Sequence, residues 1–175
     1  MAIVKMDINE YASNQPQSVK KWLAETDKLM RDGGCRVISS VVSNSKRTDG
    51  KFTYTSKQTK KSICIINIGT SGNFISMRGN HFMRPNGELT ILDKLPQDIY
   101  NFIMSGVGCG LGHCLNLDYS INHNKSCVHD NAEVFEHNGQ KSYKCGHNGW
   151  RFDLNEDTNF EVLTKWIELE LAWSG

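Results

Sequence analysis

Cysteine and histidine side chains gather in the second half of this sequence. Four of the six cysteines and five of the six histidines lie between residues 109 and 147. Thiolate sulfur and imidazole nitrogen are the ligands that Zn²⁺ prefers, and structural zinc sites hold four of them in a tetrahedral arrangement. We therefore predict a zinc-type metal site, and its ligands are Cys109, Cys114, Cys127 and Cys145.

The spacing of these cysteines indicates how they meet. Cys109 and Cys114 lie in and just after a glycine-rich stretch, 106–112, whose backbone can fold back on itself. Cys127 and Cys145 lie on either side of a predicted hairpin, so we expect both to approach its base. The spacing matches no zinc-finger signature, and a histidine is therefore considered as a substitute for one cysteine. These substitutes are His113, His129 and His147.

A site of four thiolates is closed, because it leaves no coordination position for a water molecule. Such a site stabilises a fold and does no chemistry. If water replaced one thiolate beside His129 or His147, the site would instead be open and could activate that water as a nucleophile. A cysteine paired with a base as an enzymatic nucleophile is a further alternative.

The elements that position this cluster follow from hydrophobic periodicity and turn residues. The first half predicts a helix over 16–32, which Gly33-Gly34 ends. Short links then separate β-branched or aromatic runs, and they include a turn at Asp49-Gly50. Because no helix fits within these links, we expect an antiparallel meander. Its strands are predicted at 35–42, 51–56, 61–68 and 73–78, with Cys35 and Cys64 as core residues.

The second half predicts further strands and two helices. A short helix begins at Pro96, and Asn138-Gly139 predicts a hairpin of residues 132–137 and 140–144. The other predicted elements are strands at 88–92, 115–121 and 150–154 and a helix over 157–172. The predicted fold class is α+β: an antiparallel meander packed with helices, a small Cys-rich β-hairpin module and a C-terminal helix. Residues 1–106 and 107–175 are expected to form these two parts within one compact unit.

Composition and charge limit the localisation and the classes of partner that we expect. No apolar run exceeds four residues and no signal peptide is recognisable at the N-terminus, so we expect a cytoplasmic protein without a membrane partner. Residues 1–84 hold 14 Lys and Arg against 6 Asp and Glu, whereas residues 85–175 hold 6 against 13. The basic half could bind nucleic acid through Phe52 and Tyr54. We favour attraction between the two halves, with both aromatic residues in the core.

Two resemblances add to this interpretation. The four cysteines, the Asn138-Gly139 turn and the closing Trp150-Arg-Phe-Asp-Leu154 resemble the pattern of uncharacterised proteins of anaerobic Firmicutes, a bacterial group, over residues 109–171. The first half resembles the bacterial domain of unknown function called YdhG-like. Both resemblances imply a fold and a metal site, and neither implies a catalytic residue or a substrate.

A third resemblance concerns electron carriers. Cys127-Val128-His129 and Cys145-Gly146-His147 resemble the two ligand boxes of Rieske iron-sulfur proteins, although the second box of that family spaces its ligands more widely. The function that we expect is that of a non-enzymatic binding or adaptor protein with a structural zinc site and a protein or small-molecule partner. The alternatives are a nucleic-acid-associated protein, or an enzyme or electron carrier with an open metal, thiol or iron-sulfur site.

Overall fold

The structure is a computed structural model that describes residues 7–44, 47–70, 72–79, 95–104, 132–145 and 149–173. The chain forms two compact units. Unit 1 comprises residues 1–75 and 153–175, and unit 2 comprises residues 76–152. The division that we predict between residues 106 and 107 stays a prediction, because residues 105–131 lie outside the described part of the chain.

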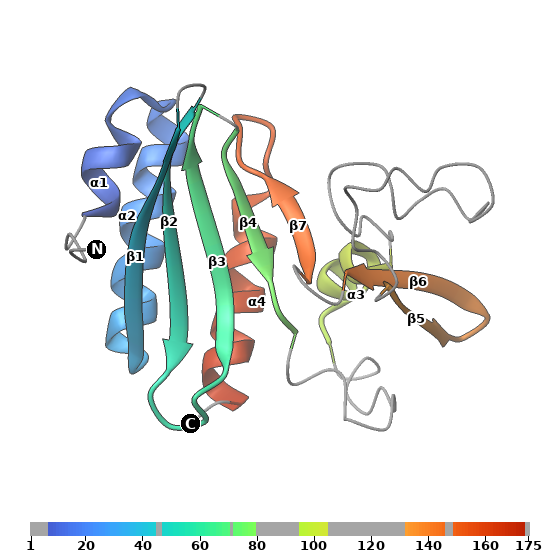
Figure 1. Ribbon diagram of the computed structural model, residues 1–175. Helices are drawn as coiled ribbons and strands as arrows, with labels where there is room; N and C mark the ends of the chain where they lie inside the picture. The colour runs from blue at the N-terminus through green and yellow to red at the C-terminus, as the bar shows by residue number, and fades with distance from the viewer. Residues whose placement is uncertain are drawn as a thin grey trace. The chain divides into compact units, whose positions relative to one another are not determined.

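The described elements confirm the α+β class (Figure 1). They form a five-stranded antiparallel sheet with the strand order β1-β2-β3-β4-β7 and a two-stranded sheet of β5 and β6. No described helix is long and apolar enough to cross a membrane. In chain order the elements are α1 (Ile8–Tyr11), the 3-10 helix η1 (Ala12–Asn14), α2 (Gln17–Asp32), β1 (Cys35–Asn44), β2 (Arg47–Ser56), β3 (Ser62–Gly69), β4 (Phe74–Met77), α3 (Gln97–Met104), β5 (Ala132–His137), β6 (Gln140–Cys145), β7 (Trp150–Asp153) and α4 (Phe160–Trp173).

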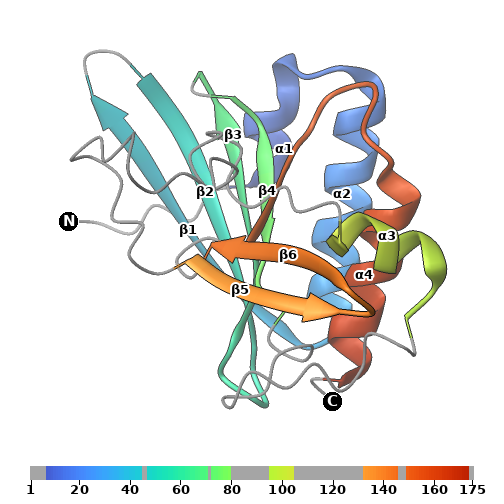
Figure 2. The same cartoon turned by 90° about the vertical axis from the view of Figure 1, so that its right-hand side faces the viewer.

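In unit 1, α1, α2 and α4 all lie on one face of the sheet, as two perpendicular views show (Figures 1 and 2). The core lies between these layers. Phe52 and Tyr54 of β2 point to the helices and are fully buried, as are their register partners Ile66 and Cys64 of β3. Burial of these side chains confirms that Phe52, Tyr54 and Cys64 are core residues, and Cys35 is buried as well.

The end of α2 shows two uses of glycine. The N–H of Gly33 donates to the carbonyl oxygen of Leu29 over 2.9 Å, and Gly34 adopts a φ of +82°, which favours glycine. A Cβ atom on Gly33 would lie 2.8 Å from Cδ1 of Leu171 in α4. The glycine that ends α2 therefore also lets α4 approach closely.

The predicted turn at Asp49-Gly50 is wrong, because both residues lie inside β2. Gly50 pairs with Ile68 of β3, and a Cβ atom on Gly50 would lie 2.7 Å from the ring of Tyr11. Glycine is required here for the close approach of α1 to the strand and not for a turn.

The final helix completes the core of unit 1. The indole Nε1 of Trp22 in α2 donates to Thr164 Oγ1 in α4 over 3.0 Å, and the Trp22 ring stacks on Phe160 at 5.0 Å between centroids. Trp166 is fully buried and donates from Nε1 to the buried Glu170 Oε1 at 3.2 Å. Two helices far apart in sequence thus pack through both polar and aromatic contacts.

In unit 2, α3 packs against the hairpin of β5 and β6. Tyr100 Oη lies 3.1 Å from His137 Nδ1, and Gln140 Nε2 donates to the carbonyl oxygen of Met104 over 3.2 Å. Positive φ angles of 50° at Asn138 and 74° at Gly139 give the turn that the Asn-Gly pair predicts. The hairpin prediction is therefore confirmed.

Candidate functional site

The predicted metal site falls almost entirely outside the described residues. Only the backbone of Cys145 is described, at the end of β6, where it pairs with Ala132. Within the part of the chain that is described, no group of three or more His, Cys, Asp or Glu residues could hold a metal ion. The zinc site thus stays a prediction. The ligands and substitutes that lie outside are Cys109, Cys114, Cys127, His113, His129 and His147.

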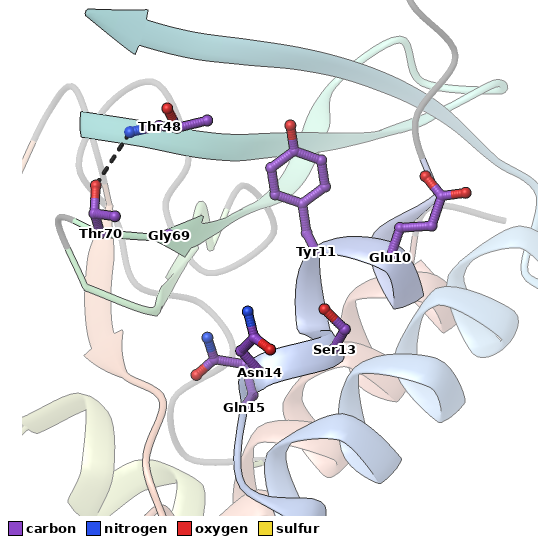
Figure 3. A pocket seen from close by; sticks show the side chains of 8 residues that line it. All are labelled: Glu10, Tyr11, Ser13, Asn14, Gln15, Thr48, Gly69 and Thr70. Carbon is purple, nitrogen blue, oxygen red and sulfur yellow. Dashed lines mark hydrogen bonds between the residues drawn. The ribbon is translucent and has the colours of Figure 1, made fainter. Parts of the chain in front are cut away.

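A pocket of about 400 Å³ lies in unit 1, where α1 and η1 meet β2 and the end of β3 (Figure 3). Its volume falls within the range of small-molecule sites. The lining comes from three separate segments of the chain, and the sheet and the first helices bring them together. The lining residues are Glu10, Tyr11, Ser13, Asn14, Gln15, Thr48, Gly69 and Thr70.

Two exposed threonines build one side of the hydrogen-bonded part of the lining, which we call the floor. The backbone N–H of Thr48 donates to Thr70 Oγ1 over 3.1 Å, as the dashed line in Figure 3 marks. The Thr70 hydroxyl in turn donates to Oδ1 of the buried Asp49 at 3.5 Å. A Cβ atom on Gly69 would lie 2.3 Å from the same oxygen, so the bare glycine lets the carboxylate lie against the strand.

The other side of the floor is held by a chain of amides. The backbone N–H of Gly69 donates to Asn73 Oδ1 over 3.2 Å, and Asn73 Nδ2 donates to Gln15 Oε1. Because a backbone N–H can only donate, it fixes the orientation of the Asn73 amide. That amide then fixes the orientation of Gln15, whose Nε2 group keeps its two N–H donors.

The rim of the pocket consists of Glu10, Tyr11, Ser13 and Asn14. None of these four side chains makes a hydrogen bond or an ion pair with a described residue. The Tyr11 ring packs edge-on against Phe52, with centroids 6.1 Å apart, which positions it as a wall. The pocket therefore combines a hydrogen-bonded floor with a rim of uncommitted polar groups, by which we mean side chains without a hydrogen bond or an ion pair to a described residue.

The described lining residues include one carboxylate, Glu10, and otherwise carry neutral hydroxyl, amide and phenol groups or none. The buried Asp49 adds a second carboxylate behind Thr70. Among the described residues of this lining there is no lysine, arginine, histidine or cysteine. The described lining residues therefore offer hydrogen-bond donors and acceptors, and the one charged side chain among them is negative.

Comparisons with known proteins add no assignment. No protein-family model, curated protein or solved structure matches this chain. The resemblances stated from the sequence therefore stay predictions, and function has to be inferred from the residues themselves.

Sequence reasoning missed this pocket. The residues of α1 and η1 show no apolar periodicity, and only the β2–β3 register places residue 48 beside residue 70. A usable signal was present in Gly69-Thr70-Ser71-Gly72, a polar loop directly after a strongly apolar strand. Loops at strand ends carry binding residues more often than strand interiors do.

Proposed function

We propose that this protein is a non-enzymatic binding protein that holds a small polar molecule in the pocket of unit 1. The observation that carries the proposal is the uncommitted rim of Glu10, Tyr11, Ser13 and Asn14 above a floor whose hydrogen bonds are already made. A preformed floor reduces the conformational entropy that binding would otherwise cost. The rim side chains then exchange water for ligand.

The composition of the lining supports binding over catalysis. A serine nucleophile needs a base within hydrogen-bonding distance, and the Ser13 hydroxyl has no such neighbour among the described residues. A general acid or base must also be held in position, and Glu10, the one carboxylate among the described lining residues, has no hydrogen bond or ion pair with a described residue that would hold its side chain.

In this proposal the second half of the chain is braced by zinc. Cys109, Cys114, Cys127 and Cys145 would hold the ion in a closed site, with His113, His129 or His147 as the substitute for one thiolate. The clustering of these residue types in the sequence is the support for the site. Zinc then stabilises the fold around the hairpin and takes no part in ligand binding.

A nucleic-acid role has weaker support. Arg36 and Lys51 occupy strand positions that alternate with the helix-facing residues, so they lie on the sheet face opposite the helices. However, Phe52 and Tyr54, the aromatic candidates for base stacking, are fully buried against the helices. The two aromatic side chains proposed for base stacking are therefore not accessible to a nucleic acid.

The proposal is tested by protein-observed NMR with a library of small polar fragments. We expect one or more fragments to shift the amide signals of Tyr11, Gly69 and Thr70, the three reporters of the pocket. Asn14→Ala should weaken binding of those fragments, because it removes a donor and an acceptor from the rim. Asn101→Ala, an exposed asparagine of α3, should leave the affinity unchanged.

Fragments that shift none of the three reporter signals would contradict a binding role for this pocket. Equal affinities for the wild type and Asn14→Ala would also count against it, because the rim would then contribute nothing.

A further inference from the structure

The hydrogen-bond donors and acceptors of the lining indicate which chemical class of ligand fits the pocket. Glu10 only accepts hydrogen bonds, whereas the hydroxyls of Tyr11 and Ser13 both donate and accept. Asn14 offers one amide oxygen and one NH₂ group. The lining therefore presents acceptors and donors side by side.

Gln15 presents only hydrogen-bond donors to a ligand. Its Oε1 is occupied by the N–H of Asn73, so its Nε2 group is left with donors alone. A ligand that carries only donors, such as an ammonium group, would satisfy Glu10 and the amide oxygen of Asn14, but it would offer no acceptor to the N–H groups of the half-buried Gln15. An unsatisfied donor in a ligand site costs affinity.

The charge of the lining disfavours an anionic ligand. An anion would accept from Gln15 and Asn14, but it would approach the carboxylate of Glu10, and none of the described lining residues is basic. Hydroxyl groups meet both conditions, because each one donates to a carboxylate and accepts from an amide, and they carry no charge.

Tyr11 adds an apolar surface to this polar lining. Its ring is half-buried and is held at the wall by the edge-on contact with Phe52. An aromatic ring beside several hydrogen-bonding groups suits a ligand that has both C–H surface and hydroxyls. The volume of about 400 Å³ places the ligand at the small end of the usual range.

From these observations we infer that the pocket binds a neutral polyhydroxylated small molecule, of the sugar or cyclic polyol type. This inference rests on the proposed binding function and specifies its ligand. Gln15 is the residue that selects hydroxyls over amines, and Glu10 is the residue that selects them over anions.

The test titrates the full chain with D-glucose and myo-inositol as polyol probes, putrescine as the amine probe and inorganic phosphate as the anion probe. The amide signals of Gly69 and Thr70 report binding. We expect at least one polyol to bind and both charged probes to leave these signals unchanged. Gln15→Glu should weaken polyol binding about tenfold and permit putrescine to bind, because the NH₂ donors are replaced by a carboxylate oxygen.

Gln15→Glu is suited to this purpose because a glutamate oxygen can still accept from Asn73, so the floor is kept. Gln58→Glu, which makes the same change at an exposed turn, is the matched control and should bind the polyol as the wild type does. Equal polyol affinities in Gln15→Glu and Gln58→Glu would overturn the assigned role of Gln15.

The outcomes separate this inference from the function on which it rests. If putrescine or phosphate shifts Gly69 and Thr70 in the wild type while neither polyol does, the ligand class is wrong and the binding function stands. If all four probes and the fragment library leave both signals unchanged, the binding function fails and the ligand class fails with it.

Discussion

The hydroxyl of Tyr54 donates a 2.8 Å hydrogen bond to Oδ1 of Asp27. The second oxygen of the same carboxylate accepts from Arg31 Nε over 2.7 Å. Tyr54 is fully buried near the end of β2, and Asp27 is half-buried within α2, so the bond joins the sheet to the helix. The carboxylate thereby satisfies the polar end of a buried aromatic side chain.

Tyr54→Phe should destabilise the protein by about 1.5–3 kcal/mol, the usual range for a hydrogen bond to a charged group. The ring and its packing remain, so the loss reports the bond to Asp27. Urea denaturation followed by circular dichroism measures the free energy of unfolding. Tyr11→Phe is the control, because the Tyr11 hydroxyl has no described partner, and it should change stability by less than about 0.5 kcal/mol. Similar losses in both variants would contradict the assignment.

Stability should fall with rising pH above about 10, the usual pKa of tyrosine. Burial, the negative charge of Asp27 and the hydrogen bond to it raise the pKa of Tyr54 above that value. The unfolded chain therefore releases this proton first, so the stabilisation is complete below about pH 10 and declines above it. One group contributes at most about 1.4 kcal/mol per pH unit. Denaturation of wild type and Tyr54→Phe at increasing pH should show their difference shrinking, and a constant difference would refute the assignment.

Gly149→Ala should destabilise unit 2 by about 3 kcal/mol or more. Gly149 has a φ of +69°, and a Cβ atom there would lie 1.9 Å from the carbonyl oxygen of Met77. Gly139 has a similar φ of +74° with no atom within 4 Å of its Cβ position. Gly139→Ala should therefore cost only the backbone strain of about 1–2 kcal/mol. Amide hydrogen exchange of residues 150–152 compares the two variants, and equal protection in both would rule out the steric contribution.

Purified reduced protein should contain about one equivalent of zinc if the four-cysteine site forms. Cys109→Ser and Cys145→Ser should lose the metal and lower the melting temperature, because closed sites couple metal binding to folding. Elemental analysis after purification without a metal-affinity column measures the content. Less than about a tenth of an equivalent in the wild type would exclude the site. Cys35→Ser, at a buried cysteine outside the cluster, should keep the zinc.

Local signals in the sequence were sufficient for several elements. α2 begins at Gln17 after Pro16 and ends before Gly33, as the proline and the glycine pair predict. The Asn138-Gly139 pair likewise predicts the β5–β6 hairpin, because type I′ turns need two positive φ angles in succession. In both cases the determining residues are neighbours in the chain.

Features that depend on contacts between distant residues could not be predicted in this way. The pair Asp49-Gly50 is typical of a turn. The glycine is explained only by the close contact between Gly50 and the Tyr11 ring, which comes from a distant part of the chain. Asp27 is a charged residue of α2, and only the packing of α2 on β2 brings it to the buried Tyr54. The pocket depends on the strand register in the same way, whereas the cysteine cluster remains a prediction from composition alone.

The two-segment construction of unit 1 has a consequence for synthesis. Residues 1–75 supply α2 and the first strands, and residues 153–175 supply α4, whose Thr164 and Phe160 contact Trp22. On the ribosome, all of unit 2 is translated between these two segments. The apolar side of α2 around Trp22 therefore stays uncovered by α4 until residues 153–175 emerge, and unit 2 can begin to fold before unit 1 is complete.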